Sequence, residues 1–387
     1  MFAFRLARAK PRSSTAVMAV ALAAITFAPS TGALAQSGIG RAANAATGQS
    51  LRDAVEQVQR DLADQQAQGT KAGSGEGSSG ALGGFNAFPS GRLRSSHHDE
   101  LREPPGSPNN YAWTTREASA FVTGVYSIPG TVLGGQMKVG ILGGENWLSL
   151  KLRNSATDTL DTANGQFGKA SNESSLFGAN VLWSKGSSYA LATIVGFWGE
   201  THLTDAIDFC GTPGPGTQCT ARRYNFDTGG YVASLTGGHV FALSGRPDGL
   251  MLDIRGVATY TDHTGAGFLN FQGDFQKYWF SVGTLTGSAT LFMNLPMSGS
   301  ALLRPYVQGY VRQEIGYNNK LYFDFLDPAE VPNAAARHWD QAHTYGGVDL
   351  GVSYVKGNMT LGSSIYFDAS SDEHTFGGRV GVSWKLN

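Results

Sequence analysis

The chain has 387 residues and a formal net charge of −1, and charged residues make up only 15% of its composition, against roughly 25% in soluble domains. This balance excludes a strongly basic surface for nucleic acid and an acidic tail, so no nucleic-acid partner is expected. The 52 glycines and the 11% of aromatic residues favour a β-protein with close contacts between backbones, because average proteins contain only roughly 7% glycine.

The first 35 residues are organised as a secretory signal peptide. A basic start is followed by an apolar stretch from Ala16 to Ala28 and by the small residues Ala33 and Ala35, which form a cleavage site. We expect the mature chain to begin at Gln36. A retained anchor is the alternative, but a spanning helix needs about 20 apolar residues. No later stretch is long enough for such a helix, so a membrane-embedded mature chain has to form a closed β-barrel.

A helix is predicted over about residues 50–68, with Ser50 as its N-cap. Its apolar residues recur at helical spacing and form one stripe, which consists of Leu51, Val55, Val58 and Leu62. The other faces are charged. Two interpretations stay open: a solvated helix that packs on a neighbouring surface, or a helix that occupies a barrel lumen or pairs with copies of itself.

Residues 36–110 are expected to form a short periplasmic or exported segment rather than part of a sheet. Residues 72–84 form a Gly/Ser linker, and four prolines interrupt the stretch that follows, up to residue 110. The run His97-His98-Asp99-Glu100 is interpreted as a solvated polar segment rather than a metal site.

Strand-length segments with period-two alternation fill residues 111–387. We predict twelve strands, at about residues 118–128, 131–142, 146–154, 173–184, 188–199, 225–242, 249–261, 276–292, 301–314, 342–354, 358–368 and 375–386. Short connections, such as 184–187 and 356–357, alternate with long ones, such as 154–171, 200–222 and 316–340. This asymmetry is typical of outer-membrane barrels, so the predicted fold is an all-β, antiparallel, up-and-down transmembrane barrel with a short helical or disordered N-terminal extension.

In such a barrel the apolar face of each strand contacts lipid and the polar face lines a wet lumen. In the segment 147–153 this rule puts Leu148, Leu150 and Leu152 on the lipid side, opposite Trp147 and Ser149. The charged residues expected to face the lumen are Asp253, Arg255, Arg304, Arg312, Glu314, Asp349 and Arg379. They either stabilise the wet interior and hold a plug, or form a selectivity lining for solutes.

Aromatic residues fall near the predicted strand ends, where amphipathic rings favour the bilayer interface. They are Trp183, Trp198, Tyr231, Tyr260, Tyr354 and Trp384.

The two cysteines, Cys210 and Cys219, lie close together in one loop-like stretch. An exported protein meets oxidising conditions, which favours a local disulfide over two free thiols. No His lies near enough to add metal ligands. The sequence contains no G-x-S-x-G, Walker, H-E-x-x-H or C-x-x-C motif. We therefore expect neither enzymatic activity nor a cofactor.

Three stretches in the C-terminal half together resemble the translocator β-domain of the autotransporter family: Thr228 to Asp262, Leu302 to Gly316 (LLRPYVQGYVRQEIG) and Tyr345 to Asn387. The resemblance implies a twelve-stranded barrel in the outer membrane of a Gram-negative bacterium, with both barrel ends in the periplasm. It also implies outer-membrane lipid, periplasmic chaperones and the barrel-assembly machinery as partners, and export of an N-terminal passenger. In the last strand, the residues that match the family's assembly signal are Val380, Val382, Trp384 and Leu386.

The sequence departs from the family pattern in three places. Family barrels usually end on an aromatic residue, but this chain ends at Asn387. Only about 75 residues separate Gln36 from the predicted barrel, with no repeats. The predicted helix is separated from the first predicted strand, whereas the family's lumen helix directly precedes it. The pair Asn109-Asn110 is interpreted as a turn rather than a self-cleavage site.

The predicted function is that of an autotransporter-type outer-membrane barrel that translocates or anchors a short N-terminal segment. The alternatives are a porin-like solute channel and a surface adhesin or receptor that uses its long loops.

Overall fold

The computed structural model describes residues 31–69, 85–98, 111–154, 168–205, 222–244, 249–269, 275–298, 301–323, 343–371 and 373–386. It contains one long helix, α1 (Thr31–Gly69), of 39 residues, which is about 58 Å in length. Within the described residues, no helix is both long enough and apolar enough to cross a membrane.

The strands form one antiparallel sheet. They are β1 (Phe85–His98), β2 (Tyr111–Ser127), β3 (Gln136–Asn154), β4 (Gly168–Lys185), β5 (Ser188–Asp205), β6 (Arg222–Ala242), β7 (Leu250–Leu269), β8 (Phe275–Met293), β9 (Leu295–Pro296), β10 (Leu302–Phe323), β11 (Thr344–Lys356), β12 (Met359–Ala369) and β13 (Glu373–Leu386). Each long strand pairs with its neighbours in sequence, and β1 pairs with β13. The sheet therefore closes into a barrel of twelve strands, and the two-residue β9 pairs only with the start of β10.

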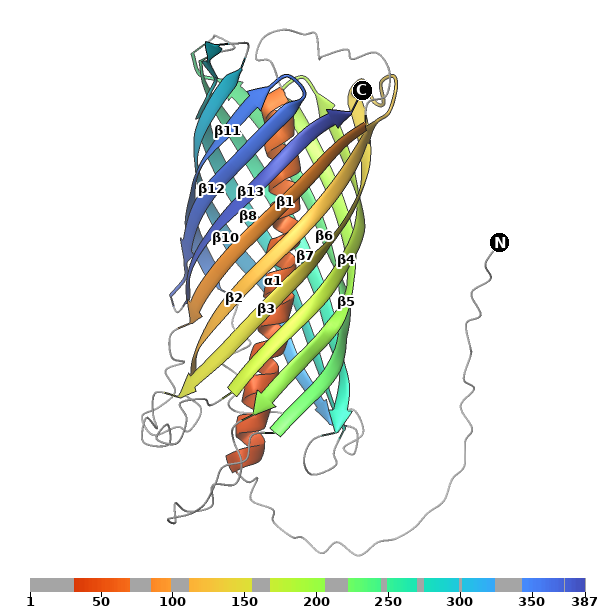
Figure 1. The fold of residues 1–387 in the computed structure, drawn as a ribbon, viewed down its shortest axis with the longest axis vertical. Coiled ribbons are helices and arrows are strands. Elements are labelled where there is room, and N and C mark those ends of the chain that lie inside the picture. Colours follow the sequence, from red (N-terminus) through yellow and green to blue (C-terminus); the bar gives the residue numbers. More distant parts are fainter. Residues whose placement is uncertain are drawn as a thin grey trace, which may run out of the picture.

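The two ends of the barrel differ in their connections. Residues 99–110, 155–167, 206–221 and 324–342 join strands at one end, here called the long-connection end. At the other, the turn end, Gly186 and Gly357 begin two-residue turns with φ of +58° and +56°, a conformation that glycine adopts without steric cost. The predicted asymmetry of connections is present for these four. The connections 270–274 and 370–372 at the long-connection end are short, so a long loop predicted between the strands now called β7 and β8 is absent. The end of β13 and the start of β1 both lie at the turn end (Figure 1).

The prediction that the barrel begins near residue 111 is wrong, because Phe85–His98 is strand β1 and pairs with both β2 and β13. Its inward-facing side chains include Arg92, Arg94 and Ser96, all buried. Its other face carries Pro89, Gly91, Ser95 and His97, with Leu93 as the one large apolar side chain among them. This strand therefore lacks the alternation of apolar and polar residues by which the other strands were recognised.

The seam between β1 and β13 is interrupted near the turn end. The pairing runs from Phe85 to Ala87 and resumes at Ser90, so Phe88 and Pro89 have no partner on β13. Proline has no backbone N–H to donate to a sheet, which explains why the ladder lapses here.

The three strands predicted at 118–128, 131–142 and 146–154 are two strands, β2 and β3. The presumed turn at residues 143–145 lies inside β3. A Cβ at Gly144 would lie 2.3 Å from the carbonyl oxygen of Ala120, so this glycine permits close packing rather than a turn. The predicted number of strands is confirmed only because β1 was missed and β3 was split.

The outer surface of the barrel has an apolar belt. Leu93, Val122, Ile141, Leu235 and Val311 all expose more than half of their surface there. Aromatic side chains border it: Trp198, Tyr231 and Tyr260 toward the long-connection end, and Trp384 toward the turn end. Such a belt with aromatic borders is the lipid-facing surface of a membrane barrel.

Beyond the belt, the polarity of the long strands is reversed. On β3, Leu148 and Leu150 are buried inside the barrel, whereas Trp147, Ser149 and Lys151 are exposed outside. The expectation that these leucines face lipid is therefore wrong. Strands β3 to β8 have 18 to 21 residues, against 11 to 14 in β1 and β11 to β13. Their extra length rises above the belt, where water favours polar side chains outside and apolar ones inside.

Helix α1 lies inside the barrel along its axis (Figure 1). At Gly48 the helix comes so close to β8 that a Cβ would lie 2.2 Å from Cδ1 of the fully buried Phe280. Phe280 packs with Ala45 and Val282, so its ring has little room to move aside.

We expect Gly48→Leu to destabilise the folded barrel by about 1–3 kcal/mol, because the new side chain overlaps Phe280. The measurement is the temperature at which the compact band on an SDS gel converts to the unfolded band. Adding Phe280→Ala should restore part of the loss, and Gly237→Ala, which meets nothing within 4 Å, is the control. Equal stability of Gly48→Leu and the natural chain would show that the contact is unimportant.

Candidate functional site: the helix in the lumen

The helix predicted over residues 50–68 lies within α1. It was interpreted either as a solvated helix on a neighbouring surface or as a helix in the barrel lumen, and in the structure it lies in the lumen. Both of its faces are buried: Leu51 is 0% exposed and Arg52 only 1%. The charged faces therefore need partners from the barrel wall, because an unpaired buried charge is costly.

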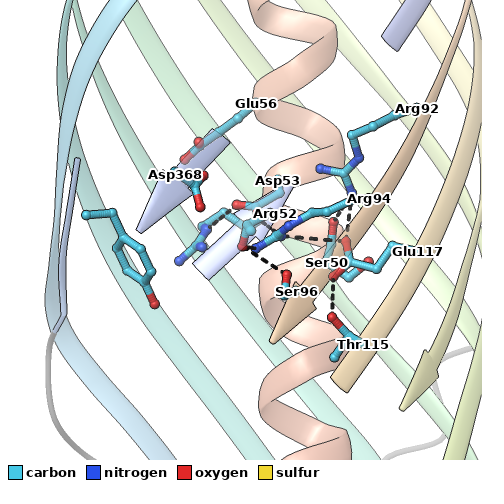
Figure 2. Close-up of polar contacts among 12 residues, drawn as sticks. Ser50, Arg52, Asp53, Glu56, Arg92, Arg94, Ser96, Thr115, Glu117 and Asp368 are labelled. Carbon is cyan, nitrogen blue, oxygen red and sulfur yellow. Dashed lines mark hydrogen bonds and ion pairs between the residues drawn. The ribbon is translucent and has the colours of Figure 1, made fainter. Parts of the chain in front are cut away.

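An ionic cluster surrounds Asp53 midway along the lumen (Figure 2). The Asp53 carboxylate receives Arg52 Nε at 2.9 Å and Arg312 Nη1 at 3.2 Å, and it also forms an ion pair with Arg94. Arg52 comes from the helix, Arg94 from β1 and Arg312 from β10. The carboxylate therefore ties the helix to β1, the next element in the chain, and to β10, which follows more than 200 residues later.

The cluster extends along the wall. Arg52 Nη1 lies 2.8 Å from Glu314 Oε1, and Arg94 Nη2 lies 3.3 Å from Glu373 Oε1 on β13. Arg92 Nη2 lies 3.0 Å from Glu117 Oε2 and donates to the backbone carbonyl of Ser50. Pairs of this kind satisfy charges that a lumen filled by a helix would otherwise leave desolvated.

A second ionic layer lies closer to the turn end. Arg255 Nη2 on β7 lies 2.6 Å from Asp64 Oδ1 on the helix. Arg379 on β13 lies 2.6 Å from Asp349 and within 4 Å of both Asp61 and Asp64. The helix is thus held at two levels, one on each side of residues 56–60.

Neutral hydrogen bonds complete the attachment. Asn146 Nδ2 donates to Ser50 Oγ at 3.0 Å. The hydroxyls of Ser234 and Thr236 both donate to Gln59 Oε1, at 2.6 and 2.9 Å. These contacts give the helix a defined rotation in the barrel, since each donor meets only one helix position.

Toward the long-connection end the contact becomes apolar. Ala43 and Ala46 pack with Leu148, Leu150, Ala170, Leu203, Phe226 and Tyr278. This cluster is formed by the reversed part of the long strands, and it closes the lumen around the N-terminal half of the helix.

Small polar cavities remain beside the other half of the helix. One of about 70 Å³ lies between Asp61, Asp64, Tyr306, Ser353 and Arg379. A second, of about 10 Å³, shares Asp64 and Tyr306 and adjoins Arg304. Both lie on the turn-end side of the ionic cluster.

All seven charged residues predicted to face the lumen have buried side chains on the inner surface. Arg255, Arg312, Glu314 and Arg379 contact the helix directly. Asp253 and Asp349 bind two of these arginines from the wall, and Arg304 donates to Asn294 at 2.5 Å and lies over the ring of Phe292.

The sequence interpretation missed half of the site: Arg52, Asp53 and Asp64 on the helix, Arg92 and Arg94 on β1, Glu117 on β2 and Glu373 on β13. A signal was present in Arg92 and Arg94, whose spacing of two places both on one face of a strand.

The other predicted residues are distributed as follows. Val380 and Trp384 are exposed on the outer face of β13, Val382 is half-buried, and Leu386 lies in that strand. Cys210, Cys219, the linker 72–84, Asn109-Asn110 and nearly all of the expected signal peptide lie outside the described residues; Thr31–Ala35 begin α1.

His97 and His98 are paired in β1 rather than in an irregular segment. In the part of the chain that the structure describes, no group of three or more His, Cys, Asp or Glu residues is placed to hold a metal ion.

Solved structures of this architecture are similar to the chain. The β domain of the Bordetella autotransporter BrkA matches at 16% identity with a TM-score of 0.52, covering 79% of this chain and 99% of that one. The transport unit of the autotransporter AIDA-I from Escherichia coli matches at 12% identity with a TM-score of 0.56, covering 84% and 97%. The translocator domain of the autotransporter NalP from Neisseria meningitidis matches at 16% identity with a TM-score of 0.54, covering 85% and 98%.

The chain therefore has the fold of autotransporter translocator domains, as the sequence resemblance predicted. No family model and no curated protein matches its sequence.

We expect Asp53→Asn to lower the free energy of unfolding by about 3–5 kcal/mol, because it leaves buried arginines without their shared carboxylate. The readout is again the temperature of the gel-band conversion. Glu145→Gln is the matched control, since Glu145 is exposed outside and bonds only to Ser175 among the described residues. A variant as stable as the natural chain would mean that the cluster does not hold the helix.

Proposed function

We propose that this chain is an outer-membrane barrel of the autotransporter type, which holds its N-terminal segment by α1 and presents it at the long-connection end. The observation that carries this proposal is the direction of the helix. Its N-terminal end lies at the long-connection end, and its C-terminal end lies at the turn end, where β1 begins (Figure 1). A chain that passed outward through the lumen would come to rest in this arrangement.

The proposal includes the export route expected from the sequence. A signal peptide cleaved after Ala35 brings the chain to the periplasm, chaperones deliver it there, and the barrel-assembly machinery inserts it with β13 as the signal strand. The exposed apolar side chains of Val380 and Trp384 support that role for β13. The long-connection end then faces the outside of the cell, because short turns face the periplasm in such barrels.

A porin-like channel is less well supported, because the helix occupies the lumen and binds the charges that would otherwise line a pore. For the same reason we assign these charges to holding the helix rather than to catalysis.

The topology is tested by labelling with a membrane-impermeant maleimide in a background of Cys210→Ser and Cys219→Ser. Ser37→Cys, at the N-terminal end of α1, should react in intact cells. Ser187→Cys, in the turn between β4 and β5, should react only after the outer membrane is permeabilised. The opposite pattern would place the helix in the reverse direction and end the proposal.

Conductance in planar bilayers tests the role of the ionic cluster. The natural chain should show little current, because the lumen is filled. Asp53→Arg should raise the open probability, because a further cation facing Arg94 and Arg312 repels the helix from the wall. A large and stable pore in the natural chain would favour the channel alternative.

A further inference from the structure

Three cations lie together on the outside of the barrel near the long-connection end. Lys151 on β3 stands directly opposite Lys169 on β4, and Arg116 on β2 stands opposite Ser149, two residues before Lys151. Arg116 and Lys151 are exposed and Lys169 is half-buried. We call Arg116, Lys151 and Lys169 the basic cluster.

Among the residues that the structure describes, the basic cluster has no counter-charge. No ion pair between any of its members and a carboxylate occurs among the described residues, and like charges directly opposite each other on antiparallel strands are destabilising. Glu117, next to Arg116 on β2, points inward and pairs with Arg92. On the outer face of these strands the described acidic side chains lie nearer the apolar belt, where Glu145 accepts a hydrogen bond from Ser175 and Glu173 stands opposite Trp147. An external anion would offset this repulsion.

The position of the basic cluster relative to the apolar belt indicates which kind of anion can bind it. On the same outer face, Trp147 lies four residues from Lys151, about 13 Å along the strand. Farther toward the turn end come the exposed side chains of Ile141, Phe177 and Val122, which belong to the apolar belt. The cluster therefore lies just above the lipid-facing surface, at the height of lipid head groups.

We propose that the basic cluster binds the phosphate groups of a phosphorylated glycolipid in the outer leaflet of the membrane. Arg and Lys form charge-assisted hydrogen bonds with phosphate, and Arg does so with two donors at once. The acyl chains of the same molecule extend past Trp147 toward Val122, Ile141 and Phe177, which lie six to ten residues from the cluster along their strands. A phosphorylated lipid contacts both the basic cluster and these apolar side chains, whereas a free phosphate ion contacts only the basic cluster.

A neighbouring acidic row limits where the phosphates bind. Glu173, Glu200 and Asp227 stand side by side on β4, β5 and β6 and are all exposed outside. They repel phosphate, so the phosphates are confined to the part of β2, β3 and β4 that lies nearer the long-connection end than Glu173. The assignment of the outer leaflet rests on the proposed function, because it takes the long-connection end as the external one.

The test uses the full chain in detergent, with native mass spectrometry to count bound lipid. The probes are a diphosphorylated lipid A, the same lipid after enzymatic removal of its phosphates, and phosphatidylglycerol. Inorganic phosphate is added as a competitor. The main variant is Arg116→Gln with Lys151→Gln and Lys169→Gln. The matched control removes three exposed cations elsewhere, by Lys185→Gln, Lys277→Gln and Lys356→Gln.

The natural chain should bind the diphosphorylated lipid roughly tenfold more tightly than the dephosphorylated one, since charge-assisted bonds to phosphate are lost with the latter. The main variant should lose that preference, and the control should keep it. Equal binding of the two glycolipids, or an unchanged preference in the main variant, overturns the proposal. Complete competition by inorganic phosphate, or equal binding of phosphatidylglycerol, also overturns it, because the site would then not recognise a glycolipid.

The compact band on an SDS gel verifies that each variant is folded. Binding in detergent does not depend on membrane orientation, whereas the cysteine labelling depends on it alone. A reversed labelling pattern together with intact lipid binding would therefore refute the proposed function. The expected labelling pattern together with no preference for the phosphorylated lipid would refute only the lipid site.

Discussion

The pairing of one carboxylate with three guanidinium groups connects the parts of this molecule. Asp53 on α1 binds Arg94 from the first strand and Arg312 from β10, together with its neighbour Arg52. Lipid cannot satisfy a backbone group or a charge, so the sheet has to close and its interior has to be neutralised. The charged side chains of the helix neutralise those of the barrel wall, and the positions of the wall charges in turn determine where along the lumen the helix lies. The barrel and its contents are therefore one folded unit.

The barrel combines two kinds of architecture along its axis. Around the apolar belt, the strands are apolar outside and polar inside, as lipid requires. Above the belt, β3 to β8 continue with Leu148, Leu150 and Leu203 inside and charged residues outside. There the N-terminal half of the helix acts as the core of a water-soluble β-structure, with Ala43 and Ala46 in contact with the wall. The small size of these alanines allows a helix to fit where the wall itself is lined with bulky side chains.

Much of the fold was predictable because most strands keep a simple alternation. The segments around Asp253, Arg312 and Asp349 placed their charges inward and their leucines and valines outward, as the structure does. Three features were not predictable from local pattern. The outer face of β1 has few apolar residues, Gly144 serves close packing rather than a turn, and the leucines of β3 lie beyond the membrane. The partners of the helix charges could not be identified from the sequence, because they come from strands as distant as β10, where Glu314 lies 262 residues from Arg52, and β13, where Arg379 pairs with Asp61 and Asp64. Only the closed fold brings those partners to the helix.

Because the ladder between β1 and β13 is interrupted at Phe88 and Pro89, side-chain contacts in the lumen contribute to closing the barrel. The first and last strands lack a continuous ladder where they meet, yet Arg94 of β1 reaches both Asp53 on the helix and Glu373 and Thr375 on β13. Arg94 thus links the two strands directly through Glu373 and Thr375, and it links the first strand to the helix through Asp53. Closure of the barrel therefore depends on side-chain contacts in the lumen as well as on the backbone ladder between its first and last strands.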